Sequence, residues 1–189
     1  MKQAIIVSTC KKFKCWRDNF IKTLNTDYPV IFVNNTEEKN MYDVLGVTTG
    51  IDLGIEEFLV LHDTTEIKDN AVFDIVFKDH KGKTVFLNPH GQMFLNKYVL
   101  KDMLTCGVDF NPLYQVKDKL GAVMAEGGFH SAIKQKCNPI VLFPEFIDGP
   151  KREIKFGRVN MVIENKYLKK YKGCWNQELI QDAKKYIPK

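Results

Sequence analysis

The chain has 189 residues, of which 44% are hydrophobic and 27% charged, as expected of a globular protein with a substantial core. Its net charge of +5 is too modest for the dense basic surface of a nucleic-acid-binding protein, although it can attract anionic ligands. No stretch approaches the roughly 20 apolar residues of a membrane span, and the N-terminus lacks the long apolar stretch of a signal peptide. We therefore expect one cytoplasmic domain over residues 1–189, without a membrane span and without a nucleic-acid partner.

The first half of the chain alternates between two kinds of apolar pattern. Short apolar runs at 3–8, 30–33 and 58–61 predict buried strands, whereas helical spacing predicts helices at 16–24, 40–49 and 70–77. Strands that alternate with helices imply right-handed crossovers and a parallel sheet. The pattern therefore predicts an α/β fold with a mostly parallel, Rossmann-like central sheet flanked by helices.

The second half is less regular. We expect a strand at 84–87, a helix at 94–104, a looser region at 107–125, and another helix that opens at Glu126-Gly127-Gly128. A strand-like run follows at 140–143, then a charged loop at 148–158 and an apolar run at 159–163. Residues 167–189 are basic, and we interpret 161–189 as a C-terminal helical tail.

The cysteines give little support for a metal site or for disulfides. They are odd in number and scattered, and they are Cys10, Cys15, Cys106, Cys137 and Cys174. The one close pair, Cys10 and Cys15, has no second pair to complete a zinc site. The pattern favours reduced thiols in a cytosolic protein.

Polar, metal-capable side chains follow directly on the apolar run at 58–61. His62, Asp63 and Glu66 stand where that strand is expected to end, and ligand crevices in open α/β sheets lie outside the carboxyl ends of strands. A carboxylate there can hold Mg²⁺ or Mn²⁺ and bring the ion to phosphate oxygens. Asp63 is the first candidate; Glu66 is a supporting one. Both side chains can instead cap the following helix.

Several of these features together resemble a nucleotide-sugar glycosyltransferase of the GT-A fold. The first strand is followed by Ser8-Thr9-Cys10-Lys11, the second ends in Asn34-Asn35, and Gly50 and Gly54 precede the sequence EEFLVLHD. That family carries an Asp-X-Asp motif at this strand end, and its last Asp holds the divalent ion that bridges the donor diphosphate. The motif falls on Leu61-His62-Asp63, so the last Asp is kept and the first is replaced by leucine. The resemblance covers roughly residues 3–130.

The resemblance implies roles for residues in the first half of the chain. Thr9 and Lys11 would approach the base or phosphates of a nucleotide-diphosphate sugar, Asn34 would bind the base or ribose, and His62 would lie beside the donor. Polar residues after a strand are also common turn formers, which is the competing interpretation of each. Residues 1–87 would then form the nucleotide-binding half.

Residues 88–160 would form the sugar and acceptor half. The segment from Asn88 to Leu100 resembles a loop that leads into a helix along the donor sugar, so that His90, Gly91 and Gln92 line the sugar pocket. Gly91 would allow close approach of the backbone. A plain turn histidine after Pro89 is the alternative for His90.

Glu126 and His130 complete the predicted site. Inverting members of the family use a carboxylate near a helix start as the general base toward an acceptor hydroxyl, and Glu126 matches that position. His130 could ligate the metal or contact phosphate, although a histidine among apolar residues is commonly structural. Lys151, Arg152, Lys155 and Arg158 form a basic segment that could close over a diphosphate or be a solvated face.

The leading hypothesis is therefore a metal-dependent glycosyltransferase, with Mn²⁺ or Mg²⁺ on Asp63 and Glu126 as the general base toward a glycan or other hydroxyl acceptor. One alternative is a metal-dependent phosphoesterase that uses His62, Asp63, His80, His90 and His130. The other is a non-catalytic nucleotide- or sugar-binding module, since the Asp-X-Asp motif is incomplete.

Overall fold

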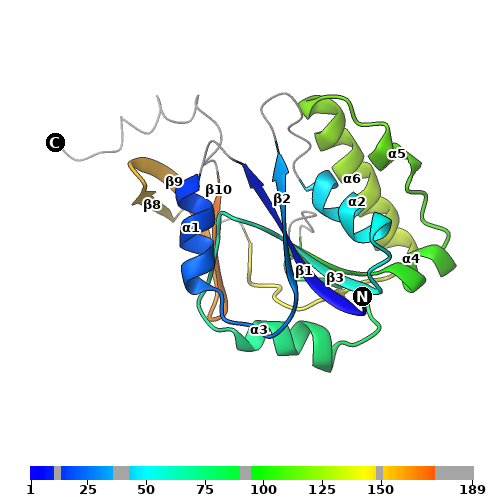
Figure 1. Cartoon of the computed structure of the whole chain (residues 1–189), viewed down its shortest axis with the longest axis horizontal. Coiled ribbons are helices and arrows are strands. Elements are labelled where there is room, and N and C mark those ends of the chain that lie inside the picture. The colour runs from blue at the N-terminus through cyan, green and yellow to red at the C-terminus, as the bar shows by residue number, and fades with distance from the viewer. Residues whose placement is uncertain (11–13, 36–42, 90–94, 148–150, 173–189) are drawn as a thin grey trace.

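The computed structural model describes residues 1–10, 14–35, 43–89, 95–147 and 151–172 (Figure 1). Their elements, in chain order, are β1 (Gln3–Cys10), α1 (Lys14–Thr23), β2 (Val30–Asn35), α2 (Val44–Asp52), β3 (Glu57–His62), β4 (Thr65–Ile67), α3 (Ala71–Asp74), the π-helical turn η2 (Ile75–Asp79), β5 (Val85–Phe86), β6 (Leu95–Val99), α4 (Leu100–Thr105), α5 (Asn111–Tyr114), α6 (Lys119–Lys136), β7 (Ile140–Val141), β8 (Arg152–Lys155), β9 (Arg158–Glu164) and β10 (Leu168–Lys172).

The first sheet has six strands in the order β2-β1-β3-β6-β5-β7. Strands β2, β1 and β3 run parallel, as do β5 and β7, whereas β6 is antiparallel to both of its neighbours. The α/β class with a mixed, mostly parallel sheet flanked by helices is therefore confirmed. From β1 the chain moves to β2 on one side and then returns to β3 on the other, so the strand order reverses between β1 and β3.

Helices cover both faces of this sheet. Figure 1 shows α1 on one side of β1 and β2, and α2 with α6 on the other. The alternation along β1 matches this arrangement, because Ile5 and Val7 belong to one apolar cluster and Ala4 and Ile6 to a second. The two clusters make the doubly covered core that continuous apolar strands predict.

The predicted helix at 94–104 is wrong for its first half. Residues Leu95–Val99 form β6, every one of them buried, and only Leu100–Thr105 is helical. A short apolar run is ambiguous between strand and helix, and here antiparallel pairing with β3 decides for the strand. Residues 95–99 thus belong to the sheet instead of to a helix along a sugar pocket.

The helix that carries Glu126 begins earlier than predicted. Helix α6 spans Lys119–Lys136, so Glu126 lies in its interior, and α5 occupies part of the region expected to be loose. Asp118 caps α6 by accepting a hydrogen bond from the Gly121 amide at 2.8 Å. Packing of Phe129 and Ile133 against the sheet outweighs the cost of Gly127 and Gly128, about 1 kcal/mol for each glycine in a helix.

A second, four-stranded sheet joins β4 to the last three described strands in the order β4-β10-β9-β8, and all its pairings are antiparallel. The charged loop predicted at 148–158 contains strand β8. The predicted helical tail is wrong for residues 161–164 and 168–172, which belong to β9 and β10, and its part at 173–189 lies outside the described residues. Among the described helices, none combines the length and apolar character needed to cross a membrane.

Candidate functional site

The candidate site lies at the carboxyl ends of β1 and β3, where the strand order reverses. In open α/β sheets this reversal opens the crevice in which ligands bind. Ser8 of β1 is paired in register with His62 of β3, and the amide of Asp63 donates to the Ser8 carbonyl oxygen at 3.1 Å. Asp63 is thus held directly beyond the end of β3, as the sequence predicts.

Asp63 and His62 form a buried pair. The side-chain exposures are 0% for Asp63 and 7% for His62, and Oδ1 of Asp63 lies 3.2 Å from His62 Nδ1. Oδ2 of Asp63 has no hydrogen-bond partner among the described residues. A fully buried carboxylate oxygen without a partner is costly, so it marks a position where a ligand or cation would be stabilising.

Asp43, at the start of α2, approaches the same histidine from another element. Its Oδ1 lies 4.0 Å from His62 Nε2, and although Asp43 occupies the N-cap of α2, its side chain makes no capping hydrogen bond. Close packing brings α2 down to the sheet: a Cβ on Gly46 would lie 2.9 Å from a Val60 methyl carbon and 3.1 Å from Ser8 Oγ. Gly46 therefore allows the approach that places Asp43 beside His62.

Two charged residues from later in the chain, Glu126 and Lys170, change the pKa values of Asp43 and His62. Burial raises the pKa of Asp43 well above its ordinary value, and the nearby carboxylate of Glu126 raises it further, whereas Lys170 opposes the increase. Burial lowers the pKa of His62, and Lys170 lowers it further against the effect of Asp63. The His62 ring is therefore biased toward its neutral form.

Glu126 is half-buried in the middle of α6, and its charge acts on both Asp43 and Tyr98. Burial raises the pKa of Tyr98 far above its ordinary value, and the charges of Glu126 and Asp43 add to this effect. Tyr98 accepts a hydrogen bond at 3.1 Å from Asn96 Nδ2, both from β6. The structure thus brings Glu126 toward Asp43, although from a helix interior and not from a helix start.

Lys170 enters from β10 of the second sheet. Its side chain is buried, and its ammonium group hydrogen-bonds the Thr64 hydroxyl in the turn directly after Asp63. The amide of the next residue, Tyr171, donates to the Thr64 carbonyl at 2.9 Å and holds β10 against that turn. We call Asp43, His62, Asp63, Thr64, Glu126 and Lys170 the strand-end cluster.

Thr9 and Asn34 lie together at the ends of β1 and β2. The Thr9 hydroxyl contacts Asn34 Oδ1 at 2.5 Å and the Val33 carbonyl at 3.2 Å. Thr9 is 1% exposed, whereas Asn34 is exposed. By strand alternation the two side chains project from the α1 face, opposite to the face of Ser8 and His62.

The remaining predicted residues are not joined to the strand-end cluster by the described contacts. The ring of His130 packs against Phe86 of β5 with centroids 4.4 Å apart, and β5 is separated from β3 by β6. Burial lowers the pKa of His130. Lys11, His90, Gly91 and Gln92 lie outside the described residues.

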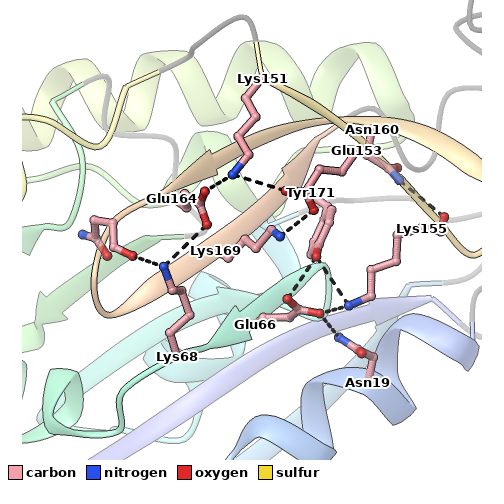
Figure 2. Close-up of polar contacts among 11 residues, drawn as sticks. Asn19, Glu66, Lys68, Lys151, Glu153, Lys155, Asn160, Glu164, Lys169 and Tyr171 are labelled. Carbon is pink, nitrogen blue, oxygen red and sulfur yellow. Dashed lines mark hydrogen bonds and ion pairs between the residues drawn. The ribbon is translucent and has the colours of Figure 1, made fainter. Parts of the chain in front are cut away.

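Glu66 does not cap the following helix. It lies in β4, where Asn19 donates to it at 3.0 Å and Tyr171 donates to its other oxygen at 3.0 Å, and Lys155 forms an ion pair with it (Figure 2). Asn70 occupies the N-cap of α3. The basic segment is likewise engaged in ion pairs, since Lys151 contacts Glu153 and Glu164.

Sequence reasoning missed two charged members of the strand-end cluster. Asp43 directly precedes the apolar residues of α2, so its N-cap position could be predicted from the sequence, whereas its proximity to His62 could not. Lys170 belongs to the sequence LKKYK, in which neighbouring lysines give no local sign of which one is buried.

The described residues contain no group of three or more His, Cys, Asp or Glu side chains arranged to hold a metal ion. Comparisons of the chain with models of known protein families, with curated proteins and with solved structures gave no match.

Proposed function

We propose that this protein is a glycosyltransferase that moves a sugar from a nucleotide-diphosphate sugar to an acceptor hydroxyl. In this proposal Asp63, at the sheet's reversal point, has the role of the last Asp of the GT-A Asp-X-Asp motif and holds the divalent ion. The observation that carries the proposal is the position of the Asp63 carboxylate. It lies beyond β3 next to β1, where α/β sheets bind nucleotides, and it keeps one buried oxygen without a partner among the described residues.

The Asp63 carboxylate fits a Mg²⁺ or Mn²⁺ ion that takes few of its ligands from the protein. One carboxylate oxygen is available, and Mg²⁺ is commonly held by one or two carboxylates while substrate phosphates and water complete its coordination. Asp63 would hold the ion, and a bound ion supplies positive charge to the departing diphosphate. His62, hydrogen-bonded to the other oxygen, fixes the orientation of the carboxylate.

Glu126 is the proposed general base. A general base must come within hydrogen-bond reach of the hydroxyl whose proton it takes, and Glu126 approaches the strand-end cluster from α6, where its charge acts on Asp43. Asn34, exposed at the end of β2, would contact the base or ribose, with its amide oxygen hydrogen-bonded by the Thr9 hydroxyl.

The phosphoesterase alternative requires several histidines around Asp63. The carbonyl oxygen of His80 accepts from Lys97 at 2.6 Å, and the same ammonium group pairs with Glu57, the first residue of β3, at the opposite end of the strand from Asp63. His130 packs on Phe86. These positions favour the glycosyltransferase over a histidine-rich metal site.

The test begins with a thermal-shift panel of nucleoside diphosphates and nucleotide sugars, each with Mn²⁺, with Mg²⁺ and with EDTA. A ligand at a hundredfold excess over Kd stabilises the folded state by about 2.7 kcal/mol, which is readily seen in Tm. The stabilising donor is then assayed for transfer and hydrolysis. We expect turnover with metal and none with EDTA.

Two variants and one matched control sharpen the assay. Asp63→Asn should remove turnover, and Glu126→Gln should lower kcat about 100-fold or more with little change in KM. Asp79→Asn, an exposed aspartate of η2, should leave both unchanged. Unaltered turnover in Asp63→Asn would refute the proposal; phosphate release from simple esters would indicate the phosphoesterase, and binding without turnover would indicate the binding module.

A further inference from the structure

Strand β10 carries two adjacent lysines with opposite surroundings. Side chains alternate along a strand, so Lys170 shares its face with Leu168, which is 1% exposed in the apolar core. Lys169 and Tyr171 project from the other face, where Lys169 pairs with Glu153 at 2.5 Å (Figure 2). Lys170 is 3% exposed. A buried lysine on an apolar strand face needs an explanation that its outward neighbour does not.

The register that buries Lys170 is fixed from several directions. Lys170 lies opposite Thr65 of β4, and Lys169 lies opposite Glu66. Tyr171 donates to Glu66 at 3.0 Å, and its ring packs against Trp16 of α1 with centroids 5.1 Å apart. A slip of one residue would exchange the two lysines and break these contacts.

The Lys170 ammonium group lies within the strand-end cluster. It contacts the hydroxyl of Thr64, the residue after Asp63, in the turn that follows β3. In open α/β sheets, ligands bind at the carboxyl ends of the strands where the strand order reverses, and a positive charge at that place favours an anionic ligand.

We infer that Lys170 and Thr64 form a phosphate subsite that binds the diphosphate of the ligand at the carboxyl end of β3. The identity of the anion rests on the proposed function. A lysine ammonium is a compact charge suited to phosphate oxygens, and the threonine hydroxyl adds a hydrogen-bond donor. Because Lys170 is 3% exposed, groups around it must move as the anion enters.

The subsite is tested by titration calorimetry with inorganic pyrophosphate, with EDTA and then with Mn²⁺. The two variants are Lys170→Met, which keeps an unbranched side chain without charge, and Thr64→Val, which removes one hydroxyl and leaves every charge in place. Lys169→Met is the matched control, since it removes the same charge from the outward face. We expect Lys170→Met to weaken binding at least about tenfold and Thr64→Val a few-fold, in both conditions.

The outcomes separate this inference from the proposed function. Equal pyrophosphate affinity in wild type, Lys170→Met and Thr64→Val would overturn the subsite, while metal-dependent nucleotide-sugar turnover would still stand. An equal loss in Lys169→Met would also overturn it, because the effect would then be one of net charge. Failure of the wild type to bind pyrophosphate or any nucleotide sugar would overturn both. If Lys170→Met does not fold, Thr64→Val alone decides.

Discussion

The buried ion pair between Glu57 and Lys97 offers the sharpest test of the fold. Lys97 of β6 is fully buried, and its ammonium group donates to Glu57 Oε2 at 2.9 Å and to the His80 carbonyl at 2.6 Å. The other carboxylate oxygen of Glu57 accepts from the Gly82 amide at 3.0 Å. Burial lowers the pKa of Lys97, and Glu57 opposes that effect. The pair therefore joins β3, β6 and the turn before β5.

Removal of one partner should cost more than removal of both. Glu57→Gln leaves the Lys97 ammonium ion buried without a counter-charge, and we expect a loss of about 3–5 kcal/mol in the free energy of unfolding. Lys97→Met should cost less, about 2 kcal/mol, because Glu57 keeps the Gly82 amide and some contact with water. The double variant leaves no charge behind, so we expect a loss of about 1–2 kcal/mol, well below the sum of the single variants.

Urea denaturation of the four proteins measures this cycle, with the midpoint and slope both fitted. Asp74→Asn is the control, since it removes one partner of the exposed Lys78–Asp74 pair and should leave stability unchanged. Losses that add in the double variant would refute the reasoning, because they would show that the two charges do not compensate each other in the folded state.

Three further results are expected. Gly50→Ala should destabilise the protein by about 1–3 kcal/mol in urea denaturation, because its Cβ would lie 2.6 Å from the buried Phe58 ring. Burial raises the pKa of Asp43, so its contribution to stability is lost as pH rises through that pKa; Asp43→Asn should melt above wild type at pH 8 and lose this advantage toward pH 4. Burial and the Cys106 thiol raise the pKa of Cys137 to about 12, so alkylation at pH 8, followed by mass spectrometry, should be at least about 100-fold slower than at exposed Cys15.

Each of these three has its own control or contrary outcome. Gly127→Ala, on a part of α6 where a Cβ meets nothing within 4 Å, should instead stabilise by about 1 kcal/mol, and equal effects at Gly50 and Gly127 would contradict the packing argument. An Asp43→Asn variant that is less stable than wild type at every pH would show that the carboxylate stabilises α2. Equal labelling rates at Cys137 and Cys15 would contradict the raised pKa of Cys137.

The sequence alone determined the parallel half of the main sheet and the position of Asp63. Strands β1, β2 and β3 are short apolar runs that end in polar residues. The change from apolar to polar residues marks the end of such a strand without reference to the rest of the chain. The reversal between β1 and β3 was not predicted: two right-handed connections place β2 and β3 on opposite sides of β1 when α1 and α2 cover opposite faces of the sheet, as they do here (Figure 1). Asp63 was therefore predictable at a strand end without knowledge of any distant contact.

Only the tertiary structure decided which other charges join Asp63. Leu95–Val99 became a strand because β3 offered an antiparallel edge, and Glu126 was moved into a helix interior by the cap at Asp118. Strand β10 has lysines on both of its faces, so alternation gives no local signal, and pairing with β4 and β9 alone selects Lys170 for burial. Such choices depend on register between segments far apart in the chain, which no local pattern encodes.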